Sequence, residues 1–184
     1  MLDKMIGFIG AGNMGSAMIG GILDASLVTT SQIITSAHSP ETLDKIRTKF
    51  SIETTQSNEV VAERSDILFL AVKPNKFAEV LPQIKDHLKP DCIVVSIAAG
   101  QPISNIEAIL GKIKLIRAMP NTPALVGAAM SALCPNDKVT AEEVKLIESL
   151  FNSFGRAEVV PESMMDAVVG VSGSSPAYVY MFIE

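Results

Sequence analysis

The sequence predicts an α/β protein whose mainly parallel sheet is covered by helices on both faces. Up to about residue 160, short apolar segments alternate with segments of helical periodicity, the pattern of parallel strands joined by helical crossovers. Several of these segments, such as the one within residues 66–72, are continuously apolar rather than alternating. Continuous apolar strands are typical of a sheet buried on both sides.

The expected elements follow one another with short connections. A strand at residues 5–9 leads into a helix that starts near residue 14, and the remaining strands are expected at residues 32–36, 52–54, 66–72, 93–96, 113–117, 128–134 and 156–160. The remaining helices are expected at residues 40–50, 58–63, 77–88, 103–110 and 140–153. Two of them have capping signals: Ser39 precedes Pro40 at the first helical position, and Thr140 lies three residues before Glu143, as in a capping box.

The last residues differ in character from the rest. Ser175 is the expected N-cap of a final helix with Pro176 in its first turn, and residues 178–183 are apolar on every side. A helix this short is marginal alone, and one that is apolar all round requires burial in something larger. We therefore expect a domain over residues 1–160, followed over residues 161–184 by a connection and the first helix of a second, truncated domain.

A glycine-rich turn follows the first strand. Gly10, Gly12 and Gly15 have the GxGxxG spacing, in which the first glycine permits the tight turn, the second lets a pyrophosphate approach the backbone, and the third lets the helix pack against the strand. The start of the helix offers unpaired N–H groups to phosphate. The turn predicts a Rossmann-type, doubly wound fold with extra C-terminal strands, and a cofactor site that includes Gly10, Ala11, Gly12, Asn13, Met14 and Gly15.

A second cofactor element is expected directly after the strand at residues 66–72. If this strand lies beside the first one across the topological switch point, its final turn faces the glycine turn across the ligand. That turn contains Ala71, Val72, Lys73 and Pro74. Taken alone, Lys73-Pro74 is better explained as a plain strand-ending turn, and it is the pairing with the glycine turn that favours the cofactor site. Residues 96–100 and 117–123, at the ends of the next two strands, are expected to line the same crevice.

The residues after the second strand bear on the identity of the cofactor. An acidic residue about 20 positions past the glycines would bind the ribose 2′-hydroxyl of NAD, and residues 35–39 contain no carboxylate. Ser36, His38 and Ser39 could instead hydrogen-bond a 2′-phosphate. NADP is therefore favoured and NAD stays possible, because the usual arginine is also missing and Ser39 is equally explained as a helix cap.

Composition excludes several other classes of protein. The net charge is −5, and no lysine or arginine cluster stands out to bind nucleic acid. The sequence shows neither a signal peptide nor an apolar run of the roughly 20 residues that span a bilayer. Cys92 and Cys134 lie in apolar segments, as expected of free thiols in a reducing compartment. We expect a cytoplasmic chain with no membrane contact, whose partner is a small-molecule substrate.

Groups for acid–base or metal chemistry are few. His38 and His87 are the only histidines, and no serine–histidine–aspartate set, carboxylate pair or metal-ligand cluster can be assembled. The sequence therefore nominates neither a catalytic residue nor a metal ligand, and a bound cofactor would carry the chemistry.

Four segments together resemble the pyrroline-5-carboxylate reductase family. They are Phe8-Ile9-Gly10-Ala11-Gly12-Asn13-Met14-Gly15, Phe69-Leu70-Ala71-Val72-Lys73-Pro74, Arg117-Ala118-Met119-Pro120-Asn121-Thr122-Pro123 and Ser172-Gly173-Ser174-Ser175-Pro176-Ala177-Tyr178. The resemblance implies reduction of 1-pyrroline-5-carboxylate to L-proline with NADPH or NADH, the last step of proline biosynthesis. It also implies a homo-oligomer, formed in the family by a helical domain that follows the cofactor domain.

The same resemblance implies roles for individual residues. The glycine turn would hold the pyrophosphate, Ser36 would lie near the adenosine phosphate, and Asn58 would contact cofactor or substrate. The nicotinamide region would be lined by residues 71–74 and by Ile97, Ala98 and Ala99. The sequence ends at Glu184, before the family's helical domain with its glycine- and threonine-rich substrate motif, so the chain as given is expected to be inactive alone.

Two other interpretations remain open. A related β-hydroxyacid dehydrogenase would have a similar cofactor domain, followed by a lysine-bearing catalytic helix and a glycine-rich substrate loop after the fifth strand. A non-catalytic NADP-binding module would use the same glycine turn without chemistry. The full-length sequence would separate these, because the reductase requires a downstream helical domain.

Overall fold

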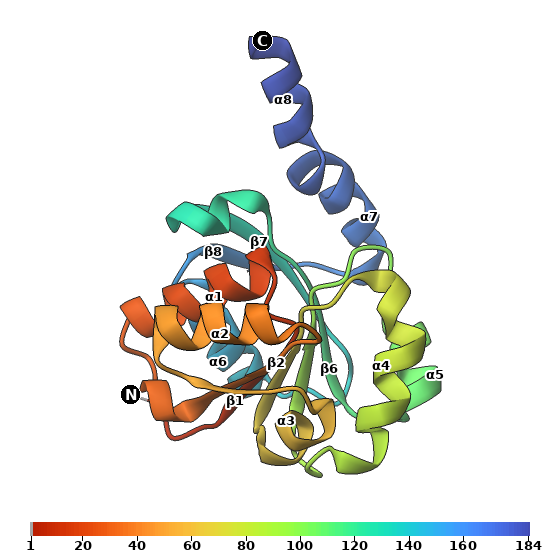
Figure 1. Ribbon diagram of the computed structural model, residues 1–184. Coiled ribbons are helices and arrows are strands. Elements are labelled where there is room, and N and C mark those ends of the chain that lie inside the picture. Colours follow the sequence, from red (N-terminus) through yellow and green to blue (C-terminus); the bar gives the residue numbers. More distant parts are fainter. Residues whose placement is uncertain (1) are drawn as a thin grey trace.

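The computed structural model describes residues 2–184, which contain an eight-stranded sheet with helices on both faces (Figure 1). The strand order is β3-β2-β1-β4-β5-β6-β7-β8, and every neighbouring pair is parallel except β6 and β7. The strands are β1 (Ile6–Ile9), β2 (Ile33–Ser36), β3 (Glu53–Thr55), β4 (Ile67–Leu70), β5 (Ile93–Ser96), β6 (Lys114–Met119), β7 (Ala129–Pro135) and β8 (Gly155–Val159). The predicted fold class, including the extra C-terminal strands, is confirmed.

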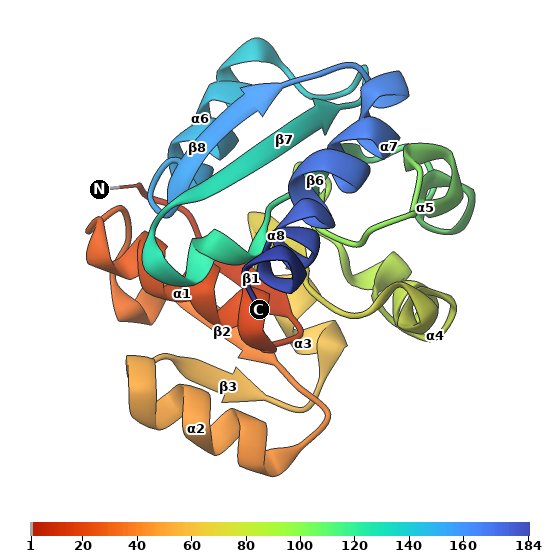
Figure 2. The same ribbon diagram turned by 90° about the horizontal axis from the view of Figure 1, so that it is seen from above.

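The helices form two layers with the sheet between them (Figure 2). One apolar core joins a face of the sheet to α1 (Asn13–Asp24), α2 (Pro40–Phe50) and α6 (Ala141–Phe151). The other joins the opposite face to α3 (Asn58–Arg64), α4 (Phe77–Ile84) and α5 (Ile103–Leu110). Both layers are needed because β1, β2, β4 and β5 are buried along their whole length.

A chain of aromatic side chains anchors α6 to the sheet. Phe8 and Phe69, on neighbouring strands, stack with their ring centroids 4.7 Å apart. Phe151, at the end of α6, lies 6.1 Å from Phe69 and 5.3 Å from Phe154 in tilted geometry. All of these rings are almost completely buried, so they connect the centre of the sheet to the segment that leads into β8.

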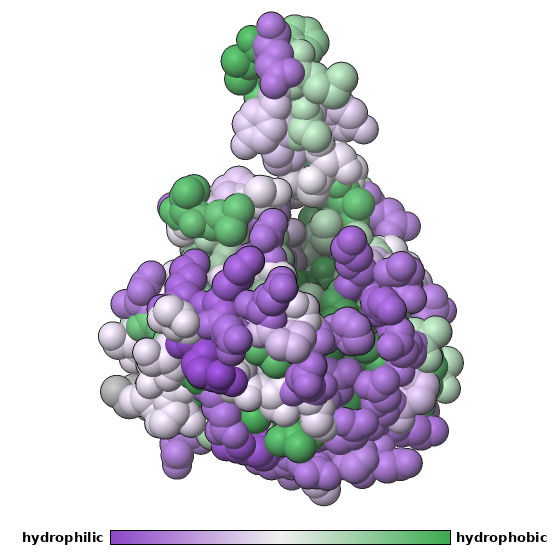
Figure 3. Space-filling view, in the orientation of Figure 1, coloured by the Kyte–Doolittle hydropathy of each residue, from purple (hydrophilic) through white to green (hydrophobic). Residues whose placement is uncertain are grey.

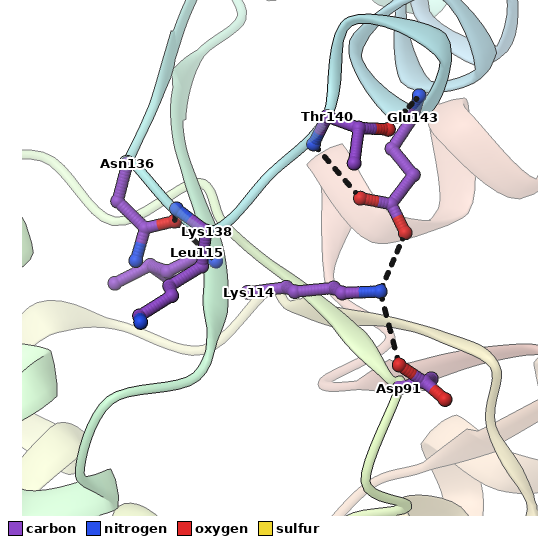
Figure 4. A network of polar contacts seen from close by, with 7 residues as sticks. All are labelled: Asp91, Lys114, Leu115, Asn136, Lys138, Thr140 and Glu143. Atoms are coloured by element: carbon purple, nitrogen blue, oxygen red, sulfur yellow. Dashed lines mark hydrogen bonds and ion pairs between the residues drawn. The ribbon is translucent and has the colours of Figure 1, made fainter.

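The predicted capping box at the start of α6 is present and is tied to the sheet (Figure 4). The Thr140 N–H donates to Glu143 Oε2 at 2.9 Å, and the Glu143 N–H donates to Thr140 Oγ1 at 3.3 Å. Lys114 Nζ on β6 donates to Glu143 Oε1 at 2.7 Å and to Asp91 Oδ1 at 3.1 Å. Burial by itself would raise the pKa of Glu143, but the hydrogen bond from Lys114 and those at Thr140 hold it below its usual value.

We expect Glu143→Gln to destabilise the protein modestly at neutral pH and to leave its stability unchanged in acid. Because the folded pKa of Glu143 is lowered, its contribution is present above the unfolded pKa and is lost as the pH falls through the folded pKa. Urea unfolding of both proteins at neutral and acid pH measures this difference. Glu142→Gln, a charge change at an exposed neighbour, is the control. A deficit of equal size at every pH would contradict the prediction.

Among the predicted elements that end earlier than expected, two adjoin the loop after β4. The helix predicted at residues 77–88 ends at Ile84, and the tighter turn η3 (Lys85–His87) follows it, because the last turn of a helix often closes in 3₁₀ geometry. The strand predicted at residues 66–72 ends at Leu70. Ala71 to Lys73 are therefore in the turn itself, followed by η2 (Pro74–Lys76).

The segment after β8 is helical almost throughout. It contains η5 (Glu162–Met164), α7 (Met165–Val168), the π-helical turn η6 (Val169–Gly173) and α8 (Ser175–Ile183). Ser174 is the N-cap of α8, so the prediction of Ser175 was wrong by one residue. The reason is that η6 continues into α8 and Ser175 already has helical geometry.

Helix α8 projects away from the sheet (Figure 1) and carries apolar surface (Figure 3). Its large apolar side chains are all at least half exposed, and Phe182 is 95% exposed. Exposed apolar surface of this kind is typical of a contact site. No helix within residues 2–184 has the length and apolar character to cross a membrane.

Candidate functional site

Two adjoining hollows lie at the carboxyl ends of the central strands. The first, here the switch-point hollow, has a volume of about 400 Å³ and is lined by Gly12, Asn13, Met14, Ala71, Val72, Lys73, Pro74, Ile97, Ala98, Ala99, Met119, Pro120, Asn121, Thr122 and Gly173. The second, the β2 hollow, has a volume of about 490 Å³ and is lined by Gly10, Ala11, Gly12, Ser36, Ala37, His38, Ser39, Thr42, Gln56, Asn58, Val72, Lys76, Glu79, Val80 and Gln83. Gly12 and Val72 belong to both.

The position of these hollows follows from the strand order. β1 pairs in parallel with β2 on one side and with β4 on the other, so the order of the chain reverses at β1. Ligands of open α/β sheets bind at this switch point, outside the carboxyl ends of the strands. The expected proximity of the glycine turn to residues 71–74 is therefore observed.

Each glycine of the turn is explained by a different feature of the structure. Gly10 has φ of +99°, and a Cβ there would lie 2.6 Å from the Ala71 carbonyl oxygen. A Cβ on Gly15 would lie 2.7 Å from the Gly10 carbonyl oxygen. Both contacts are too close for a side chain, so these glycines are required by the fold. A Cβ on Gly12 would meet nothing within 4 Å of the described residues, so the absence of a side chain there keeps the hollow open.

The first turn of α1 fits an anionic group. Gly12 is the N-cap, and the first turn contains no acidic residue and receives no side-chain cap from the described part of the chain. Backbone N–H groups at the start of a helix lack partners within the helix, and the helix dipole favours negative charge there. The residues present therefore fit the pyrophosphate of a dinucleotide.

A hydrogen-bonded chain of side chains lines the β2 hollow. Ser36 Oγ at the end of β2 donates to Asn58 Oδ1 at 2.7 Å, and Asn58 Nδ2 donates to Gln83 Oε1 at 2.7 Å. His38 and Ser39 line the same hollow, and no side-chain cap bond from Ser39 to α2 is found in residues 2–184. The structure thus brings together Ser36, His38 and Ser39, expected near a cofactor phosphate, and Asn58, expected to contact cofactor or substrate.

The switch-point hollow is bordered by the helical segment after β8. Asn121 Nδ2 donates to Ser172 Oγ at 3.1 Å, and Asn121 Oδ1 accepts from the Met130 N–H at 3.0 Å. Gly173 lies so close to Met119 that a Cβ would be 2.9 Å from the Met119 Cε. The turn η6 is therefore fixed at the edge of this hollow.

Arg117 does not line the crevice, contrary to the expectation for residues 117–123. Its side chain is almost fully buried and donates to Glu162 Oε1 at 3.2 Å and to Asp166 Oδ1 at 3.4 Å. Arg117 still lies within β6, where its side chain meets η5 and α7, and the crevice begins two residues later at Met119. Ser96 and Gly100 also lie outside the linings of both hollows.

Several residues that line the hollows were not predicted from the sequence. In the β2 hollow these include Lys76 and Glu79, whose side chains pair at 2.8 Å. Lys76 lies in the turn after β4 and Glu79 at the start of α4, only a few residues beyond the predicted Lys73-Pro74 turn. Their nearness in sequence to that turn is the signal that could have identified them. Gly173 was missed because its approach to Met119 is a tertiary contact with no sequence signal.

Among the described residues, neither a metal-ligand cluster nor a cysteine lies at this site. No group of three or more histidine, cysteine, aspartate or glutamate side chains that could hold a metal occurs in the described residues. Both cysteines are free and buried. Burial raises the pKa of Cys92 to about 12 and also raises the pKa of Cys134, which disfavours the thiolate form in which cysteine reacts.

The fold and the site define a Rossmann-type dinucleotide-binding protein. The comparisons agree: a family model described as "NADP oxidoreductase coenzyme F420-dependent" matches residues 5–100. The pyrroline-5-carboxylate reductase of Escherichia coli strain K12 is 47% identical over 184 residues, which cover all of this chain and 68% of that protein. The chain belongs to the pyrroline-5-carboxylate reductase family, as its sequence motifs indicated.

Solved structures agree with this assignment. A pyrroline-5-carboxylate reductase from Coxiella burnetii superposes with a TM-score of 0.93 at 33% identity, covering 98% of this chain and 68% of that one. A pyrroline carboxylate reductase from Plasmodium falciparum, solved with NADP bound, superposes with a TM-score of 0.90 at 34% identity, covering 100% of this chain and 67% of that one.

Proposed function

We propose that this chain binds a reduced nicotinamide cofactor across the two hollows and serves the reduction of 1-pyrroline-5-carboxylate to L-proline, the last step of proline biosynthesis. The observation that carries the proposal is the joining of the two hollows at Gly12, next to a helix start that no side chain of residues 2–184 caps. Membership of the reductase family supplies the substrate.

Within this proposal, each part of the site receives one part of the cofactor. The pyrophosphate lies against Gly10, Ala11, Gly12, Asn13 and Met14, while Gly15 holds the helix close to the turn. The adenosine end lies in the β2 hollow near Ser36, His38, Ser39 and Asn58. The nicotinamide end lies in the switch-point hollow, against residues 71–74 and Ile97, Ala98 and Ala99.

The chain contributes to the reaction mainly by positioning. A bound reduced nicotinamide would supply a hydride to the imine carbon, and the imine nitrogen takes a proton from solvent, so that the C=N bond becomes CH–NH. The side chains lining the switch-point hollow include no histidine, aspartate or glutamate among the described residues, and Lys73 is the one ionisable group there. Holding the reacting groups in place supplies several kcal/mol of barrier lowering, and small Ala71, Ala98 and Ala99 leave room for a ring.

The proposal extends to the domains of the protein, its oligomeric state and its compartment. Residues 1–160 act as the cofactor domain, and residues 161–184 begin a helical domain. The exposed apolar side chains of α8 support a contact with further protein, and we assign this contact to a homo-oligomer. Free, buried Cys92 and Cys134 support a reducing compartment, the cytoplasm.

A turnover assay on the complete gene product tests the proposed function. With NADPH present, 1-pyrroline-5-carboxylate should cause oxidation of the cofactor and formation of an equal amount of proline. A β-hydroxyacid with NADP should give no reaction. Turnover of the hydroxyacid would indicate the dehydrogenase, and cofactor binding without either reaction would indicate a non-catalytic module.

We expect NADPH to bind more tightly than NADH. The reason is that residues 35–39, at the end of β2, contain no carboxylate to repel a 2′-phosphate, while Ser39 has a hydroxyl that α2 does not use as a cap. Calorimetric titration of the chain with each cofactor measures the preference. Equal or tighter binding of NADH would contradict it.

A further inference from the structure

Lys76 and Glu79 form an ion pair at the rim of the β2 hollow. The two residues lie at the junction of η2 and α4, and Lys76 Nζ is 2.8 Å from Glu79 Oε2. Both side chains line the hollow, and both are more than half exposed. An exposed pair of this kind is weak and easily exchanged for another partner. Lys76 can therefore turn to a different anion at little cost.

This pair supplies the fixed charges of the hollow. Among the described residues that line it, Lys76 is the one lysine or arginine and Glu79 the one carboxylate. The hydrogen bond and charge of Lys76 lower the pKa of Glu79, with a smaller contribution from the charge of His38. The Glu79 carboxylate is therefore ionised at neutral pH.

Some polar side chains near the end of β2 already hydrogen-bond one another. Ser36 Oγ donates its hydrogen to Asn58, and Asn58 in turn donates to Gln83. A hydroxyl that donates to an amide oxygen cannot donate the same hydrogen to a phosphate. Ser36 therefore cannot donate to a phosphate while this bond is intact. A dianionic phosphate in the hollow is stabilised further by a nearby cation, and lysine binds phosphate as a point charge.

From these observations we infer that Lys76 binds the 2′-phosphate of NADPH and that Glu79 opposes it, so that the pair sets the preference between NADPH and NADH. The inference rests on the proposed function, because it assumes that the adenosine end of a nicotinamide cofactor occupies the β2 hollow. Lys76 replaces the arginine that the sequence lacks near residues 35–39. Glu79 both competes with the phosphate for Lys76 and repels it.

The inference predicts opposite effects of two substitutions. Lys76→Ala weakens NADPH binding about 10-fold, the usual effect of losing one charge-assisted phosphate contact, and leaves NADH binding unchanged. Glu79→Gln strengthens NADPH binding several-fold, because it frees Lys76 and removes a negative charge, and also leaves NADH unchanged. Lys76→Arg keeps the positive charge and restores NADPH binding relative to Lys76→Ala.

The experiment is a calorimetric titration of each variant with NADPH and NADH. Adenosine 2′,5′-bisphosphate and adenosine 5′-monophosphate serve as matched probes of the 2′-phosphate alone. Lys85→Ala and Glu142→Gln are the controls, because they make the same charge changes at exposed residues outside both hollows. Comparing each variant with its control separates a local contact from a change in net charge.

Several outcomes would overturn the inference, and they are distinguishable from one another. If Lys76→Ala weakens NADPH and NADH equally, or neither more than Lys85→Ala does, Lys76 does not recognise the 2′-phosphate. If Glu79→Gln weakens NADPH binding, Glu79 supports the phosphate instead of opposing it. If the unchanged protein binds neither cofactor, the proposed function fails and the inference fails with it, whereas normal binding with unresponsive variants refutes the inference alone.

Discussion

Gly12→Val is expected to abolish binding of both NADPH and NADH while the protein stays folded. The substitution places a branched side chain where the hollows meet, next to the first N–H groups of α1. Each charge-assisted hydrogen bond from backbone to phosphate contributes about 1.5–3 kcal/mol. Loss of two such bonds weakens binding at least about 100-fold.

The fold should tolerate this change because Gly12 has space and an ordinary backbone conformation. A Cβ there would meet nothing within 4 Å among the described residues, and its φ is −70°. Gly170→Val is a matched control, since Gly170 is equally open and lies outside both hollow linings. Cofactor titration and thermal unfolding measure the two properties. A folded Gly12→Val protein with normal cofactor affinity would remove the glycine turn from the site.

Phe151→Ala is expected to cost about 3–5 kcal/mol of unfolding free energy, the usual cost of deleting a buried phenyl ring. Phe151 is fully buried between Phe69 on the sheet and Phe154 before β8. Removing its ring leaves a cavity and separates α6 from the centre of the sheet. Because the cost equals a large part of the stability of a typical domain, the variant should unfold at much lower urea concentration.

Phe182→Ala is the matched control for this prediction. It deletes the same ring from α8, where the side chain is 95% exposed, so the stability of the sheet should not change. Urea unfolding of the three proteins under identical conditions gives the comparison. Equal stability of Phe151→Ala and Phe182→Ala would contradict the placement of α6 in the core.

Local sequence signals account for much of the fold. Strand β5 and helix α5 begin and end where they were predicted, because turn-forming residues such as Gly100, Pro102 and Gly111 separate them from their neighbours. The capping box of α6 is likewise a local signal that tertiary structure preserves. The antiparallel direction of β7 has no such signal, because it depends on how the chain returns after β6.

The sequence predicts which backbone segments form the site, because the strand order determines where they lie. The glycine turn and residues 71–74 meet because both follow parallel strands that end at the switch point. Side-chain direction could not be predicted in the same way. Arg117 was expected at the crevice and instead pairs with Glu162 and Asp166, residues far along the chain whose positions depend on the packing of η5 and α7.

A crystal structure of this protein with NADPH bound tests the central claim most directly. We predict the pyrophosphate against the turn of Gly10, Gly12 and the start of α1. The nicotinamide should lie in the switch-point hollow between residues 71–74 and 97–99, and the adenosine 2′-phosphate in the β2 hollow. A cofactor bound elsewhere, or one whose pyrophosphate does not contact the glycine turn, would contradict the account.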